Sequence, residues 1–196
     1  MTGVPAALAD EARPGPPPQR RPRTARRAAV AVGLVVVALV AVLATRPNAG
    51  DIVAASPLRG QPAPEVQGPD LDGTVTRLSD FRGRWVVVNF FATWCVPCLK
   101  EHPELIRFSE RHAPAEVQVV AVVYDDDPGD VRSFFRERGG DWPVIDSSRA
   151  KVDFGVLGVP ESFLITPGGI VVDRIVGGVS ADGLDRFLRQ AQAVLG

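Results

Sequence analysis

The sequence predicts an α/β fold, a mixed β-sheet with helices on both faces, preceded by one N-terminal transmembrane helix. Two nearly continuous apolar runs, at 85–91 and 117–124, are typical of strands buried on both faces, and a helical stretch separates them. A strand pair and an amphipathic helix follow near the end of the chain. A βαβ unit followed by a ββα unit is therefore expected, and one sheet covered on both faces buries all of these elements.

The charge of the chain divides it into a basic front and an acidic remainder. Residues 1–50 contain seven arginines and two acids, whereas 15 basic and 21 acidic groups follow. The acidic part excludes nucleic acid as a partner, because neutralising phosphates requires clustered Lys and Arg. Glycine and proline show no three-residue repeat, and 45% of the residues are hydrophobic, which excludes collagen-like and fully disordered chains.

Residues 28–45 form an uncharged apolar stretch of eighteen residues. As a helix this stretch reaches about 27 Å, enough to cross a bilayer. Five arginines lie directly before it, at positions 20–27, and only Arg46 lies directly after it, so the positive-inside rule places the N-terminus in the cytoplasm and the rest of the chain outside the cell membrane. A cleavable signal peptide and a twin-arginine signal are alternatives, and each of them also implies export.

Four segments are expected along the chain. Residues 1–27, rich in Pro and Arg, are predicted to be a disordered cytoplasmic tail, and residues 28–45 the signal-anchor. Residues 46–63 lack a helical or strand period and are predicted to be a linker. Residues 64–196 are predicted to be the folded domain.

The first elements of that domain are a hairpin and a strand–helix–strand unit. Asp72-Gly73 predicts the hairpin turn. The buried strand 85–91 leads into a helix over 96–111, in which Pro103 predicts a kink, and then into the strand 117–124.

The next helix is marked at both ends. Asp127 is a cap and Pro128 takes the first helical position, while Gly139-Gly140 ends the helix after Arg138. The acidic run 125–127 is explained by this cap and by loop solvation rather than by a cation site. Strands over 162–165 and 170–176 and a helix over 181–195 complete the domain.

The two cysteines form a C-x-x-C motif where the strand 85–91 meets the following helix. One helical turn brings both sulfurs within disulfide distance, and the helix N-terminus favours a thiolate at Cys95. Cys95 is therefore predicted to be the exposed, attacking sulfur, and Cys98 to resolve the mixed disulfide. Pro97 suits the first turn, because its missing N–H has no partner there.

The two cysteines allow three other interpretations. A structural disulfide closes a loop too short to add much stability, and a pair of simple buried cysteines has no chemical role. A zinc site would add His102 and His112, but His112 lies some 15 Å along the helix axis from Cys95 at ~1.5 Å per residue. Surface roles are predicted for both histidines, and neither a metal nor a cofactor is expected.

Two segments resemble the signatures of the thioredoxin superfamily. Residues 88–103 resemble its active-site strand and helix, and residues 158–165 its cis-proline loop. The closest resemblance is to the membrane-tethered thiol:disulfide interchange proteins of cytochrome c maturation, the TlpA/ResA/CcmG (DsbE) group, and it covers residues 61–196. This resemblance implies a thioredoxin-like fold.

The resemblance also implies roles for individual residues. Cys95 would be the nucleophile and Cys98 the resolving thiol. Pro160 would be cis and would place the backbone of Val159 beside the sulfurs, where a substrate strand can pair with it. Trp94 is expected to pack beside Cys95 and shield it.

Two acidic residues are further candidates. Asn89 stands where thioredoxin has a buried proton-accepting Asp, and the resemblance implies that Glu101 exchanges the proton of Cys98 instead. The alternative is a surface Glu101 paired with a neighbour. Glu161, directly after Pro160, either influences the sulfurs or is a carboxylate on the rim of the site.

The resemblance implies a membrane-anchored, extracytoplasmic thiol:disulfide oxidoreductase. Its expected task is to reduce the cysteines of apocytochrome c, with electrons from a membrane thiol relay. An oxidase that forms disulfides in exported proteins uses the same motif, because the reduction potential sets the direction. A non-catalytic tethered binding module is a further alternative. A peroxidase is disfavoured, because Thr93-Trp94-Cys95 lacks the Thr-x-x-Cys spacing.

Overall fold

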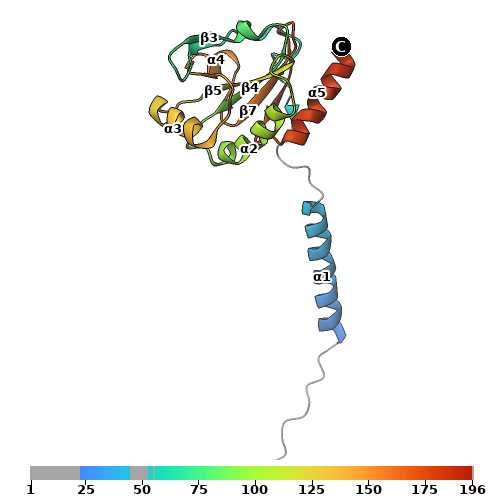
Figure 1. Ribbon diagram of the computed structural model, residues 1–196. Helices are drawn as coiled ribbons and strands as arrows, with labels where there is room; N and C mark the ends of the chain where they lie inside the picture. Colours follow the sequence, from blue (N-terminus) through green and yellow to red (C-terminus); the bar gives the residue numbers. More distant parts are fainter. Residues whose placement is uncertain (1–22, 45–52, 55, 196) are drawn as a thin grey trace, which may run out of the picture. The chain divides into compact units, whose positions relative to one another are not determined.

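The computed structural model describes residues 23–44, 53–54 and 56–195, in two units that divide after Arg46 (Figure 1). The first unit contains the helix α1 (Arg23–Ala44). Within the described part of the chain, no helix is long and apolar enough to cross a membrane. The predicted tail falls outside the described residues up to position 22, and so does the predicted linker at 46–52 and 55.

Six strands of the second unit form one mixed sheet in the order β1-β8-β7-β4-β5-β6. Strand β4 is parallel to β5 and antiparallel to β7, and β5 is parallel to β6. A separate two-stranded hairpin has its turn at the predicted Asp72-Gly73. The strands are β1 (Val53–Ala54), β2 (Gln67–Pro69), β3 (Val75–Arg77), β4 (Trp85–Phe91), β5 (Val117–Val123), β6 (Val144–Ile145), β7 (Glu161–Ile165) and β8 (Val171–Val176).

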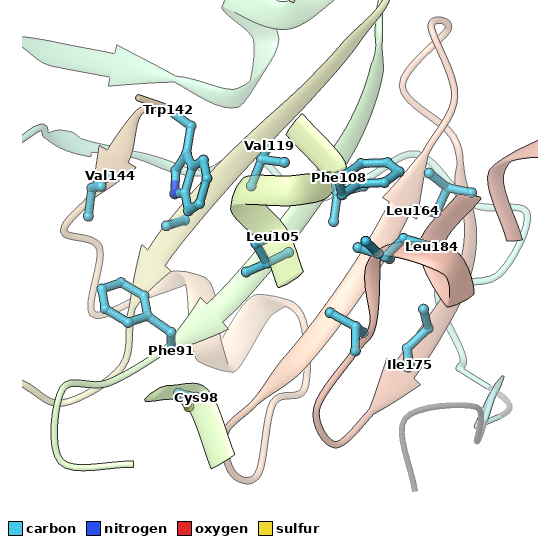
Figure 2. Close-up of a cluster of buried hydrophobic side chains, with 14 of the residues drawn as sticks. Phe91, Cys98, Leu105, Phe108, Val119, Trp142, Val144, Leu164, Ile175 and Leu184 are labelled. Atoms are coloured by element: carbon cyan, nitrogen blue, oxygen red, sulfur yellow. The ribbon is translucent and has the colours of Figure 1, made fainter. Parts of the chain in front are cut away.

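Helices cover both faces of this sheet, as predicted from the order of the elements. They are the 3-10 helix η2 (Leu78–Phe81) and the α-helices α2 (Val96–Glu110), α3 (Pro128–Arg138), α4 (Ala150–Asp153) and α5 (Ala181–Leu195). One apolar cluster joins the sheet to α2, α3 and α5, and a second joins its other face to η2 and α4. In Figure 2, Leu105 and Phe108 of α2 lie with Leu184 of α5 over the sheet, and Cys98 belongs to the same cluster.

The folded unit begins before the predicted boundary at residue 64. Val53 and Ala54 pair with β8 as the edge strand β1. Gly60 N–H donates to Val171 O at 2.8 Å, and Ala63 N–H donates to Gly169 O at 2.9 Å. The segment expected to be a linker therefore covers the outer edge of β8. An edge strand has backbone N–H and C=O groups without partners. A segment can form hydrogen bonds with these groups through its own backbone, even when its side chains show no apolar period.

The predicted cap of α3 is confirmed. Asp127 accepts hydrogen bonds from Gly129 N–H at 2.7 Å and Asp130 N–H at 3.3 Å, and Pro128 is the first residue of the helix. The other two acids of the run also have structural partners, since Asp126 accepts from Thr93 N–H and Asp125 pairs with Lys151. The acidic run thus organises the loop between β5 and α3.

We expect Asp127→Ala to lower the free energy of unfolding by about 1 kcal/mol, because two backbone N–H groups of α3 lose their acceptor. Urea unfolding of the oxidised protein measures this loss. Glu137→Ala, at an exposed position of the same helix, is the matched control and is expected to stay within about 0.5 kcal/mol of the parent. An equal loss in the two variants would contradict the capping role.

Candidate active site

The two cysteines lie at the start of α2 and form a disulfide. Cys95 is the N-cap residue, and its sulfur accepts a hydrogen bond from Cys98 N–H at 3.2 Å. Pro97 occupies the first turn, as predicted. The end of β4 and the start of α2 therefore place a sulfur at the positive end of a helix, where a thiolate is stabilised.

Exposure does not distinguish the two sulfurs. The Cys95 residue is 4% exposed and Cys98 is 3% exposed, so the expectation that Cys95 alone is exposed is wrong. The apolar residues Trp94 and Val96, on either side of Cys95 in the sequence, are 58% and 59% exposed. The two cysteines differ in their position relative to α2, because Cys95 caps the helix and Cys98 lies within its first turn.

Trp94 makes a different contact from the one expected. Its indole N–H donates to Asp125 O at 3.1 Å, in the loop between β5 and α3. The ring remains largely exposed instead of being packed as a shield over Cys95. Trp94 therefore contributes an apolar surface beside the disulfide.

The Val159–Pro160 peptide bond is cis, and the backbone of Val159 lies beside the sulfurs, as the resemblance implies. Val159 O is 3.5 Å from Cys95 Sγ. The carbonyl of Pro160 accepts a hydrogen bond from Gly177 N–H at 2.9 Å, which ties this loop to the segment that follows β8.

Glu101 is buried, so its interpretation as a surface residue is wrong. It is 3% exposed, and its Oε1 accepts a hydrogen bond from Asn89 Nδ2 at 2.9 Å. Its Oε2 accepts from Val179 N–H at 2.9 Å. Burial raises the pKa of Glu101 to about 7, although both hydrogen bonds lower it. On α2, Glu101 is three residues beyond Cys98, a spacing that places both side chains on one face of the helix.

Glu161 is also buried and does not lie on the rim. It is 5% exposed, and its Oε2 lies 3.5 Å from Arg174 Nη1 on β8. Among the described residues this oxygen has no hydrogen-bond partner. Burial raises the pKa of Glu161, and the charge of Arg174 opposes this rise. The pair supports the strand directly after Pro160, and no feature of the sequence marks Arg174 as its partner.

The structure corrects the surface role predicted for His102. This residue is 5% exposed, and its ring packs against Phe134, Phe135 and Trp142. Its Nε2 lies 2.9 Å from Gly139 O, and burial lowers the pKa of its imidazole. The apolar faces of α2 and α3 meet here, so the histidine is part of the packing between them.

His112 is half-buried and lies apart from the cysteines. Its Nε2 is 2.8 Å from Asp185 Oδ1 on α5. Both histidines thus have partners that belong to the packing of α2 against its neighbours, which leaves the zinc interpretation without its histidine ligands.

A cysteine pair at a helix N-terminus, beside a cis-proline loop on a thioredoxin-like sheet, defines a thiol:disulfide oxidoreductase. The chain belongs to the Redoxin family, whose model matches residues 58–188. It is an enzyme of the ResA/HelX/DsbE type, which excludes the purely non-catalytic binding module.

Three similar proteins illustrate the relationship. Thiol-disulfide oxidoreductase ResA of Bacillus thuringiensis is 32% identical over 133 residues, which are 67% of this chain and 77% of that protein. Thiol:disulfide interchange protein DsbE of Allochromatium vinosum is 34% identical over 131 residues, covering 64% and 71% of the two chains. The crystal structure of a thiol:disulfide interchange protein of Chlorobium tepidum matches with a TM-score of 0.63 and 29% identity, over 68% of this chain and 97% of that one.

Proposed function

We propose that this protein is a membrane-anchored reductant of apocytochrome c cysteines, acting outside the cytoplasmic membrane with electrons from a membrane thiol relay. The observation that supports the reducing direction is the buried carboxyl group of Glu101, which lies on the same helix face as the buried Cys98. The resemblance of residues 88–103 and 158–165 to the cytochrome c maturation group supports apocytochrome c as the substrate.

The proposed cycle begins with the reduced enzyme. The Cys95 thiolate attacks a substrate disulfide, a bond forms between Cys95 and one substrate sulfur, and the other substrate sulfur leaves as a thiolate. Cys98 then gives its proton to the Glu101 carboxylate and attacks the Cys95 sulfur. The second substrate sulfur leaves with the bonding electron pair and takes up a proton. The substrate is reduced by two electrons, and the enzyme is left with the Cys95–Cys98 disulfide.

The surroundings of the sulfurs favour a low reduction potential. A dithiol is a strong oxidant when the protein stabilises its thiolate form. Here both cysteines are buried, and among the described residues neither sulfur is hydrogen-bonded to a basic side chain. Burial and a neighbouring carboxylate both disfavour a thiolate. The N-terminus of α2 acts in the opposite sense, and it is the feature that favours the oxidase alternative.

We expect the Cys95–Cys98 couple to equilibrate with glutathione at a potential near that of thioredoxin, about −270 mV, or lower. The measurement is the ratio of oxidised to reduced protein, by mass spectrometry after thiol alkylation, across a series of glutathione buffers. A value near −120 mV, typical of a disulfide-forming oxidant, would establish the oxidase alternative.

The membrane anchor is proposed from residues 28–45, which are uncharged and directly follow the five arginines at positions 20–27. We expect the full-length chain to stay in the membrane pellet after alkaline carbonate extraction. Protease added outside intact cells is expected to release the catalytic domain. Detection of a mature N-terminus at Thr45 or Ser56 would show instead that the segment is a cleaved signal peptide.

A further inference from the structure

Asn89 connects three elements around the carboxyl group of Glu101. It lies in β4 and is 2% exposed. Its Nδ2 donates to Glu101 Oε1 at 2.9 Å and to Ser162 Oγ at 3.0 Å. Both amide protons are thereby used, one toward α2 and one toward β7.

The other oxygen of Glu101 has a separate donor. Val179 N–H, in the loop between β8 and α5, donates to Oε2 at 2.9 Å. Two residues earlier, Gly177 N–H donates to the carbonyl of Pro160 at 2.9 Å. The carboxyl group is therefore held from two sides, and the segment between β8 and α5 that donates to Oε2 also donates to the cis-proline loop.

No charged side chain takes part in these contacts, so Asn89 is the one side-chain donor to Glu101 among the described residues. His102 is bonded to Gly139 O and Glu161 is paired with Arg174. The titratable and charged side chains of the elements packed around Glu101 are Cys98, Lys100, His102, Glu104, Arg107 and Glu110 on α2, Glu161 on β7, and Asp182, Asp185, Arg186 and Arg189 on α5.

We propose that Asn89 is a positioning residue, whose amide orients the Glu101 carboxyl for proton exchange with Cys98 and sets the pH range in which Cys98 resolves the mixed disulfide. This inference rests on the proposed function, because it takes Glu101 as the proton acceptor. The NH2 group of Asn89 donates to the carboxylate and therefore favours the charged form of Glu101. An Asp at this position would instead repel a charged Glu101.

The test is an infrared titration of the Glu101 carboxyl in the oxidised full-length protein in detergent, because the thiols do not titrate in that state. Subtracting the spectrum of Glu101→Gln assigns the band. Asn89→Leu removes the donor at similar volume and is expected to raise the Glu101 midpoint by about one pH unit, the size of a lost hydrogen bond to a charged group. In the reduced protein, the pH profile of the resolution step is expected to shift equally.

Ser162→Ala is the matched control. It removes the other partner of Asn89 but leaves Glu101 with both donors, so its shift is expected to be less than half as large. An unchanged midpoint in a folded Asn89→Leu variant, or an equal shift in Ser162→Ala, would overturn the inference.

A second variant keeps the test decisive if Asn89→Leu does not fold. Asn89→Asp preserves the shape of the side chain, and its carboxyl is expected to titrate with Glu101 in two coupled steps more than one unit apart. Two independent steps would refute the contact. If Glu101→Gln leaves the resolution rate unchanged, the proton-acceptor role fails, while the carboxyl titration still reports whether Asn89 holds Glu101.

Discussion

Replacing Cys95 with Ala is expected to abolish thiol:disulfide exchange, with a loss of about a thousandfold or more, because the chain has only one other cysteine and that residue lies inside the first turn of α2. The substrate for this test is an oxidised peptide with the Cys-x-x-Cys-His haem-attachment motif. The rate of peptide reduction by the pre-reduced protein is the measurement.

Cys98→Ala is the complementary variant and is expected to stop the cycle one step later. Its Cys95 still attacks the peptide, but no second thiol releases it, so a covalent adduct accumulates that mass spectrometry detects under non-reducing conditions. Because the two cysteines are buried to the same extent, this assignment depends on the helix cap alone. An adduct that forms through Cys98 in the Cys95→Ala variant would reverse the two roles.

Glu101→Gln is expected to change how the stability of the oxidised protein depends on pH. The folded-state pKa of Glu101 is about 7, raised from 4.5, so the folded protein binds more protons than the unfolded chain between these values. Stability therefore falls as pH rises through this window. For Glu101 alone the loss between pH 5 and pH 8 is about 2.5 kcal/mol.

The measurement is urea unfolding of the oxidised parent and the oxidised variant at pH 5, 6, 7 and 8. The stability difference, variant minus parent, is expected to grow by about 2.5 kcal/mol over this range. His102 contributes in the opposite direction, because its lowered pKa removes stability as pH falls, but it is present in both proteins and cancels. A pH-independent difference would mean that Glu101 is ionised at pH 5 in the folded protein.

The same variant is expected to affect catalysis at one step. Cys95 attack should stay near the parental rate, while resolution by Cys98 slows, because the thiol loses its proton acceptor. Stopped-flow measurement of mixed-disulfide formation and decay separates these steps. Equal rates of decay in both proteins between pH 5 and pH 9 would remove Glu101 from the proton transfer.

Several elements are predictable from local sequence alone. The strand at 85–91 agrees with β4 residue for residue, and the helix after Asp127 agrees with α3 at both ends. An apolar run and a capped helix are encoded by residues within a few positions of each other. The short elements β1, β6 and α4 were not predicted, because two to four residues contain no period to recognise.

The sequence by itself determined the chemistry of this protein: the spacing of Cys95 and Cys98 at a strand–helix junction, and the cis-proline loop that accompanies it. Only the tertiary structure decided what surrounds that chemistry. It buried Glu101, whose position the sequence left open, and it buried His102, for which the sequence predicted a surface position. It also brought Asn89 to the Glu101 carboxyl. The reason is physical, since side-chain spacing along a helix depends on neighbouring residues, whereas burial and hydrogen-bond partners depend on which distant segments pack together.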